Sequence, residues 1–197
     1  MTKTTACLLL AGLMAASTAT ARPKKKSKTP KPGDAAPAFQ LRALDRAMVR
    51  LSDLAYEGRE RSYAPKRPVL LDFFRTDCEP CLAAMPELVK THEKYQARGL
   101  YVLLVALVEE GDDDAKKLQR YLDEKKLPFT VVVDRADYVS QKYLGKVVAL
   151  PATFLIDREG KVVKSKHDAK GSLVEYFSAE IETTLAAHDK AKPKKKK

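Results

Sequence analysis

Residues 69–81 read VLLDFFRTDCEPC, an apolar run followed after three residues by two cysteines, Cys78 and Cys81. A short apolar run of this kind is typical of a buried β-strand, and the residues after Cys81 follow a helical pattern. The cysteines are therefore predicted to lie one helical turn apart, where a helix begins directly after a strand. Unpaired backbone N–H groups point outward at such a helix start, and their positive potential favours a thiolate at Cys78. The pair is predicted to exchange electrons as a dithiol and a disulfide.

A structural zinc site is the alternative explanation of two cysteines at this spacing. Such a site needs a second pair of ligands. The only other cysteine is Cys7, and the three histidines, His92, His167 and His188, are scattered without a ligand spacing. We therefore predict a redox pair that uses neither a metal nor another cofactor.

The beginning of the chain resembles a secretory signal. Residues 1–21 contain a short apolar stretch and end in Ala19-Thr20-Ala21, the small residues that a signal peptidase requires. We expect cleavage after Ala21, with an uncleaved membrane anchor as the alternative, because the apolar stretch is short for a membrane span. Export predicts a location in the periplasm or cell envelope. In such an oxidising compartment a dithiol must be kept reduced by a partner, or else it works as an oxidant.

The formal charge of +11 lies almost entirely outside the predicted core. Residues 22–32 carry +6, residues 189–197 carry +5 and Lys3 carries +1, so residues 33–188 are left at about −1. Lysine runs mixed with proline and without apolar residues are predicted to be disordered, as a linker and a tail. They serve solubility or, alternatively, adhesion to an anionic envelope surface. Without interleaved aromatic residues they do not indicate nucleic-acid binding.

Residues 33–188 alternate between strand and helix patterns, which predicts one α/β domain with a mixed sheet flanked by helices. We expect a short hairpin within 39–51, and further strands at 69–74, 100–108, 129–133, 153–156 and 162–163. Helices are expected at 79–98, broken in character at Pro86, and at 112–125, 136–143 and 173–187, and a charged loop at 58–66. Ser172 with Glu175 forms a capping-box pattern at the start of the last helix.

This order resembles the thioredoxin fold, and counted positions strengthen the resemblance. Asp72 lies six positions before Cys78, where thioredoxins place a buried carboxylate, and Pro86 lies eight positions after it, where they place a proline in the active-site helix. Leu150-Pro151-Ala152-Thr153 resembles their segment with a cis-proline beside the disulfide. The N-terminal hairpin, the Cys-Glu-Pro-Cys motif, the helix-strand insertion before Pro151 and the export signal together resemble the TlpA/ResA branch of exported thioredoxin-like thiol-disulfide oxidoreductases.

The resemblance implies a role for each of these residues. Cys78 would be the nucleophile and Cys81 the resolving thiol. Asp72 and Glu110 would be candidate bases for Cys81, and Pro151 would shield the thiols and shape a peptide groove. One departure is Asp77, which stands where the family usually has tryptophan and whose charge opposes thiolate formation at Cys78.

The resemblance also predicts the partners. These are protein thiols and disulfides as substrates and an upstream electron donor, for which a membrane dithiol carrier is a candidate. We expect a monomer that acts as a reductase.

Two other functions share this fold. A copper or metal-handling protein usually needs a CxxxC pair and a distant histidine, for which only His167 is conceivable here. A peroxiredoxin needs a threonine three residues before the reactive cysteine, where this chain has Arg75.

Overall fold

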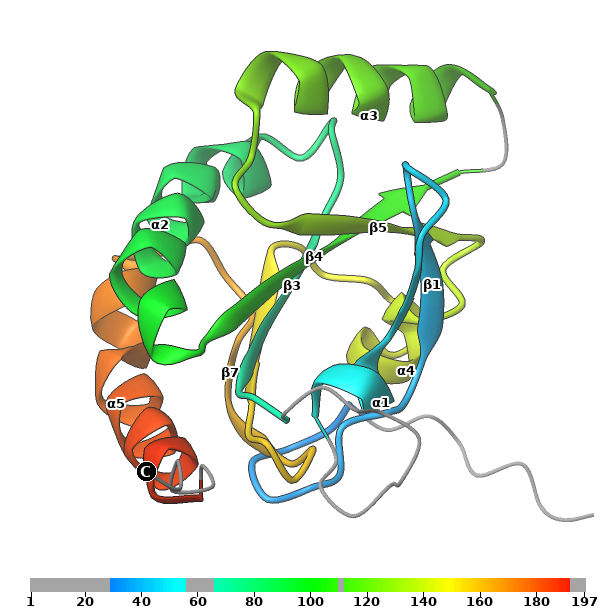
Figure 1. Cartoon of the computed structure of the whole chain (residues 1–197). Coiled ribbons are helices and arrows are strands. Elements are labelled where there is room, and N and C mark those ends of the chain that lie inside the picture. The colour runs from blue at the N-terminus through cyan, green and yellow to red at the C-terminus, as the bar shows by residue number, and fades with distance from the viewer. Residues whose placement is uncertain (1–28, 56–65, 110–111, 192–197) are drawn as a thin grey trace, which may run out of the picture.

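The computed structural model describes residues 29–55, 66–109 and 112–191, which form a seven-stranded sheet with helices on both faces (Figure 1). The strand order across the sheet is β2-β1-β5-β4-β3-β6-β7. The strands are β1 (Gln40–Ala43), β2 (Met48–Arg50), β3 (Val69–Phe74), β4 (Tyr101–Val108), β5 (Thr130–Arg135), β6 (Ala152–Ile156) and β7 (Val162–Lys166). The helices are α1 (Leu51–Leu54), α2 (Glu79–Tyr95), η1 (Gln96–Arg98), α3 (Asp112–Lys125), α4 (Ser140–Leu144) and α5 (Leu173–Ala191). None of the helices in these three described ranges is long and apolar enough to cross a membrane.

Three parallel strands, β3, β4 and β5, form the centre of the sheet. Their side chains are almost all buried, as expected for parallel strands covered on both faces. β6 pairs antiparallel with β3, and the hairpins β6-β7 and β1-β2 complete the two sides. The predicted mixed α/β sheet of thioredoxin type is confirmed, and β5, which belongs to the predicted insertion, lies between the N-terminal hairpin and β4.

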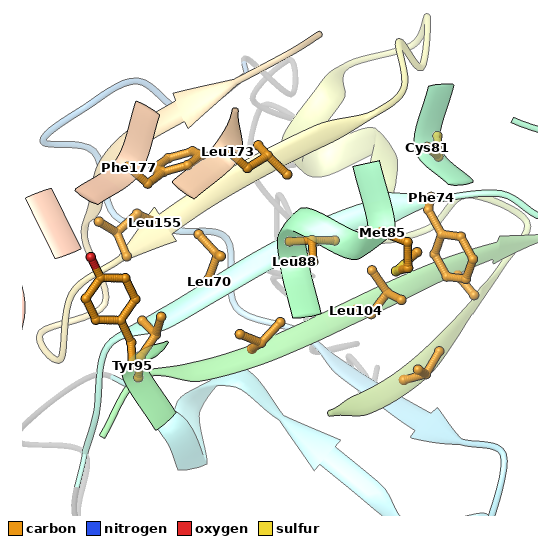
Figure 2. Packing of buried hydrophobic residues seen from close by; sticks show 14 of the residues in the cluster. Leu70, Phe74, Cys81, Met85, Leu88, Tyr95, Leu104, Leu155, Leu173 and Phe177 are labelled. Carbon is orange, nitrogen blue, oxygen red and sulfur yellow. The ribbon is translucent and has the colours of Figure 1, made fainter. Parts of the chain in front are cut away.

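Alternate residues of β3 face two separate core layers, because successive side chains of a strand point to opposite faces. Leu71 and Phe73 pack in the layer that contains residues of α1 and α4. Leu70 and Phe74 pack in the other layer, which α2, α3 and α5 cover. Figure 2 shows this second layer, in which Cys81, Met85 and Leu88 of α2 pack over the sheet residues Leu70, Phe74 and Leu104.

The expected break at Pro86 is absent, because helix α2 continues from Glu79 to Tyr95 through this residue, which is exposed. A proline removes one helical N–H donor, and exposure lets water satisfy the carbonyl that is left over. The helix tightens into η1 and stops at Gly99, whose φ of 111° is the left-handed conformation that glycine adopts readily. The predicted end of this helix at residue 98 is therefore confirmed.

The start of α4 differs from the prediction of a helix from residue 136. Ala136 and Asp137 have positive φ angles of 55° and 56°, so they form a turn, and the helix begins at Ser140. Asp134 determines this geometry, because its carboxylate accepts the backbone N–H groups of Val139 and Ser140 at 2.7–3.0 Å. Sequence periodicity contains no information about this turn.

The last helix also differs in length and in its contacts. α5 runs to Ala191, so residues 189–191, which the sequence assigned to the tail, are helical. Ser172 caps the helix as predicted, accepting the N–H of Glu175 at 3.3 Å. Its hydroxyl also donates to Glu87 at 2.6 Å, which ties the start of α5 to α2. The predicted signal segment, the linker up to residue 28, most of the 58–66 loop and residues 192–197 lie outside the described residues. The prediction of a disordered linker up to residue 32 is wrong for its last residues, because Pro30 is buried and Lys31 exchanges hydrogen bonds with Asp34.

Candidate active site

Cys78 and Cys81 are joined in a disulfide at the start of α2, directly after the connection that leaves β3. Cys78 is the residue that caps the helix, and its sulfur accepts the N–H of Cys81 at 3.3 Å. Cys78 is partly exposed, whereas Cys81 is only 2% exposed and packs in the core layer beneath α2. Cys78 is therefore the more accessible cysteine of the pair and Cys81 the covered one, as a nucleophile and a resolving thiol require.

Asp72 lies at the middle of β3 and is 3% exposed. It shares the sheet face of Leu70 and Phe74, which is the face that α2 covers with Cys81. Burial raises the pKa of the Asp72 carboxyl to about 7, and the hydroxyl of Thr153, which donates to Asp72 Oδ1 at 2.5 Å, opposes that rise. A buried carboxyl on the sheet face that α2 covers can therefore hold or release a proton near neutral pH.

The peptide bond between Leu150 and Pro151 is cis. β6 begins at the next residue, Ala152, which pairs with Phe73 near the end of β3. This register brings the Pro151 segment to the edge of the sheet where α2 begins. Leu150 and Cys78 both pack against the core layer that contains Cys81.

An arginine that sequence reasoning did not identify lies between this disulfide and the end of β4. Arg75 donates to Glu109 at 2.5 Å and to Asp77 at 3.2 Å, so one guanidinium joins two acids. The sequence predicts that Asp77 opposes thiolate formation at Cys78, and the guanidinium, which Asp77 shares with Glu109, partly offsets this effect. The sequence does show Arg75 three residues before Cys78 and close to Asp77. It does not show the second partner of Arg75, Glu109, which is 34 residues away in the chain.

The other candidate base, Glu110, lies outside the described residues. The neighbouring Glu109 directly follows β4 and is exposed, with its carboxylate held by Arg75.

The histidines that a metal-handling protein would need lie away from the thiols. His167 packs its ring edge-on against Phe154, at 5.2 Å between centroids, and Phe154 belongs to the core layer on the opposite face of the sheet from Cys81. Burial lowers the pKa of His167. His92 lies in the last turn of α2 against Phe129. Within the part of the chain that the structure describes, no three His, Cys, Asp or Glu side chains are grouped so that they could hold a metal ion.

Comparison with known proteins agrees with this geometry. Residues 32–165 match the AhpC/TSA family. The thiol-disulfide oxidoreductase ResA of Oceanobacillus iheyensis is 32% identical over 143 residues, which are 71% of this chain and 66% of that protein. ResA of Geobacillus thermodenitrificans is 35% identical over 132 residues, 67% of each protein. The chain thus spans about two thirds of the length of these two relatives.

A solved structure agrees over nearly its whole length. The thiol:disulfide interchange protein DsbE of Chlorobium tepidum superimposes with a TM-score of 0.66 at 29% identity, covering 80% of this chain and 99% of that one. The fold, the cysteine pair at the start of α2 and these relatives lead to one assignment. The chain belongs to the AhpC/TSA family, and within it to the ResA/TlpA-like thiol-disulfide oxidoreductases.

Proposed function

We propose that this protein is an exported reductase of protein disulfides that works by dithiol exchange through Cys78 and Cys81. The observation that carries the proposal is the pairing of a partly exposed cysteine, Cys78, with a buried one, Cys81, on a helix that covers the sheet face of a buried carboxyl whose pKa is about 7. Relatives named thiol-disulfide oxidoreductase support the same chemistry.

The reaction has two exchange steps. In the first, the Cys78 thiolate attacks one sulfur of the substrate disulfide; the substrate S–S bond breaks, a mixed disulfide forms, and the other substrate sulfur leaves as a thiolate that takes up a proton. In the second, the Cys81 thiolate attacks the Cys78 sulfur and expels the remaining substrate thiolate. The substrate gains two electrons and two protons, and the protein is left with its Cys78–Cys81 disulfide. An upstream dithiol donor must then reduce this disulfide, and a membrane dithiol carrier is a candidate.

Asp72 is proposed as the base for the second step. A buried thiol has a raised pKa, so Cys81 needs an acceptor for its proton. A group whose pKa lies near the working pH suits this task, because it can take up the proton in one step and release it in another. Glu110 remains a second candidate base.

Pro151 is proposed to shield the thiols and to shape the substrate groove. Its segment enters β6 beside β3, so its backbone lies at the edge of the sheet from which Cys78 emerges.

We further propose that residues 1–21 form a cleaved signal and that the protein works as a monomer in the periplasm or cell envelope. The basic segments at 22–32 and at the C-terminus are proposed to contact an anionic surface there. The apolar stretch before Ala21 and the near-neutral charge of the core support these assignments.

The test is reduction of insulin or of a disulfide-bonded model peptide by the reduced protein. We expect Cys78→Ser to abolish turnover and Cys81→Ser to accumulate a mixed disulfide that mass spectrometry detects. If Cys81→Ser formed no adduct and Cys78→Ser formed one, Cys81 would be the nucleophile and Cys78 the resolving thiol. Turnover of hydrogen peroxide or tight copper binding in place of disulfide reduction would instead favour the alternative functions.

A further inference from the structure

A groove of about 520 Å³ lies where the β1-β2 hairpin meets β5 and the turn that precedes α4. Three arginines line it: Arg42 on β1, Arg46 in the hairpin turn and Arg135 at the end of β5. All three are exposed. Since residues 33–188 carry a net charge of about −1, this local excess of positive charge is not a general property of the core.

The charges of these arginines are not used within the fold. Arg42 donates to the backbone carbonyl of Arg46 at 3.3 Å, and no ion pair joins Arg42, Arg46 or Arg135 to any carboxylate in residues 29–55, 66–109 or 112–191. The one acid that lines the groove, Asp134, is fully buried, and both of its oxygens accept backbone N–H groups at the start of α4. Three guanidinium groups are therefore available to an external anion.

The rest of the lining is typical of a protein-binding surface. Tyr138 is 64% exposed at the rim, with Lys142 Nζ 3.9 Å from the centre of its ring. Met48 from β2 also lines the groove. Arginine, tyrosine and methionine are the residue types enriched in protein interfaces.

One end of the groove, at Arg135, lies on the same face and at the same edge of the sheet as the cysteine pair, and the groove runs from there toward the opposite edge. Arg42 pairs with Val133, which packs in the same core layer as Cys81, and side chains opposite each other in an antiparallel pair share a face. Arg135 pairs with Val108 on β4, two residues beyond Ala106, the partner of Phe74. Arg135 thus lies level with the connection that leads to Cys78, and the two strand spacings between β5 and β3 correspond to roughly 10 Å.

We propose that this groove binds an acidic segment of a protein partner, which aligns a disulfide of that partner with Cys78. Guanidinium groups bind carboxylates in a bidentate geometry, which favours Asp and Glu side chains. The groove follows β1 from Arg135 to the hairpin turn, so an extended segment of about five residues spans it. The alignment of a partner's disulfide with Cys78 rests on the disulfide-reducing function proposed above, whereas the binding of an acidic segment does not.

The binding test uses the oxidised full chain and a fluorescent peptide with five consecutive Asp and Glu residues and no cysteine. We expect Arg42→Gln/Arg135→Gln to weaken binding of this peptide about tenfold. The matched control is Lys116→Gln/Lys161→Gln, which removes the same charge from two exposed positions that do not line the groove. Both double variants keep the basic segments at 22–32 and 189–197, so a difference between them reports the groove. An equal loss of affinity in the two variants overturns the proposal.

The second measurement compares two disulfide-bonded peptides, one with the acidic segment beside its cysteine and one with Asn and Gln in its place. We expect the reduced protein to react about tenfold faster with the acidic peptide at low salt, and the Arg42→Gln/Arg135→Gln variant to lose this ratio. An unchanged ratio overturns the use of the groove for substrates. If neither peptide is reduced, the proposed function is wrong. The binding test still shows whether the groove binds an acidic segment. A variant that loses affinity for phosphatidylglycerol vesicles but not for the peptide would identify a lipid surface and overturn the proposal.

Discussion

Thr153 on β6 lies directly opposite Asp72 on β3, and its hydroxyl donates to the buried carboxyl oxygen at 2.5 Å. The two residues are 81 positions apart in the chain. Through this bond the segment that begins with Pro151 is connected to the acid beneath the cysteine-bearing helix. Burial is the main reason why Asp72 resists ionisation, and this contact offsets part of that effect because the hydroxyl stabilises the charged form.

Replacing Asp72 with Asn should stabilise the oxidised protein above neutral pH. The folded pKa is about 7 and the ordinary value is 3.8, so between these values the folded state binds more protons than the unfolded chain. The contribution of Asp72 to the free energy of unfolding therefore falls as pH rises from about 4 to about 7, and it stays constant above about pH 7. We expect the variant to exceed the parent by roughly 2–4 kcal/mol at pH 8 and by little at pH 4. Urea unfolding at both pH values measures this, and an equal difference at both would show that Asp72 does not titrate as described.

Replacing Thr153 with Val should raise the pKa of Asp72 further. The variant loses the only side-chain hydrogen bond that lowers this pKa among those identified for the described residues. A hydrogen bond to a charged group is worth about 1.5–3 kcal/mol, which corresponds to roughly one to two pH units. Titration of the Asp72 carboxyl carbon by NMR measures the shift. Thr153→Ser keeps a hydroxyl, so the pKa of Asp72 in this variant should stay within about half a unit of the parent value. If Thr153→Ser shifted this pKa as much as Thr153→Val does, the cause would be packing and not the hydrogen bond.

If Asp72 is the base, Asp72→Asn should slow resolution of the mixed disulfide more than its formation. General-base assistance contributes typically 10²- to 10⁴-fold, so we expect at least about a tenfold loss. Stopped-flow resolution of a preformed Cys78 mixed disulfide, followed at several pH values, gives the rate. Glu110→Gln should add to the loss if both acids serve. Rates within about twofold of the parent for both variants would mean that water takes the proton from Cys81 directly.

Replacing Arg75 with Gln should raise the thiol pKa of Cys78. The variant leaves Asp77 uncompensated beside Cys78, and a nearby negative charge disfavours the thiolate. Because Asp77 is 72% exposed, solvent screens it and the rise should be about half a unit. The pH dependence of alkylation in a Cys81→Ser background measures this pKa. Adding Asp77→Asn should restore the parent value, and Arg98→Gln, which breaks an ion pair with Glu182 at the other end of α2, should leave it unchanged.

Deleting residues 22–28 and 192–197, which leaves the described residues from 29 on and α5 complete, should weaken binding to anionic vesicles without changing the thiol pKa of Cys78. The deleted segments carry most of the positive charge, and charges on the surface are screened beyond about 8 Å at physiological salt. Vesicle sedimentation and the alkylation profile measure the two effects. Unaltered vesicle binding would rule out adhesion through these segments.

The sequence by itself was sufficient for the elements and for the place of the cysteine pair. The apolar runs at 69–74 and 101–108 and the pattern after Cys81 are local signals, and the structure places strands and a helix there. Counting from Cys78 also located Asp72 and the proline segment, whose roles remain predictions. The strand and helix predictions succeeded because burial and helical periodicity act over a few neighbouring residues, whereas Asp72 and the proline segment were located by the resemblance to thioredoxins.

Tertiary structure alone decided which residues surround the pair. Thr153 meets Asp72 only through the register of β3 with β6, and Arg75 meets Glu109 only because β3 and β4 end side by side. Arg42 and Arg135 line one groove only because β1 pairs with β5. Each contact depends on strand pairing between distant segments, and one residue of slip would turn these side chains to the other face of the sheet. A single sequence does not contain that register, because it is set by how the whole core packs.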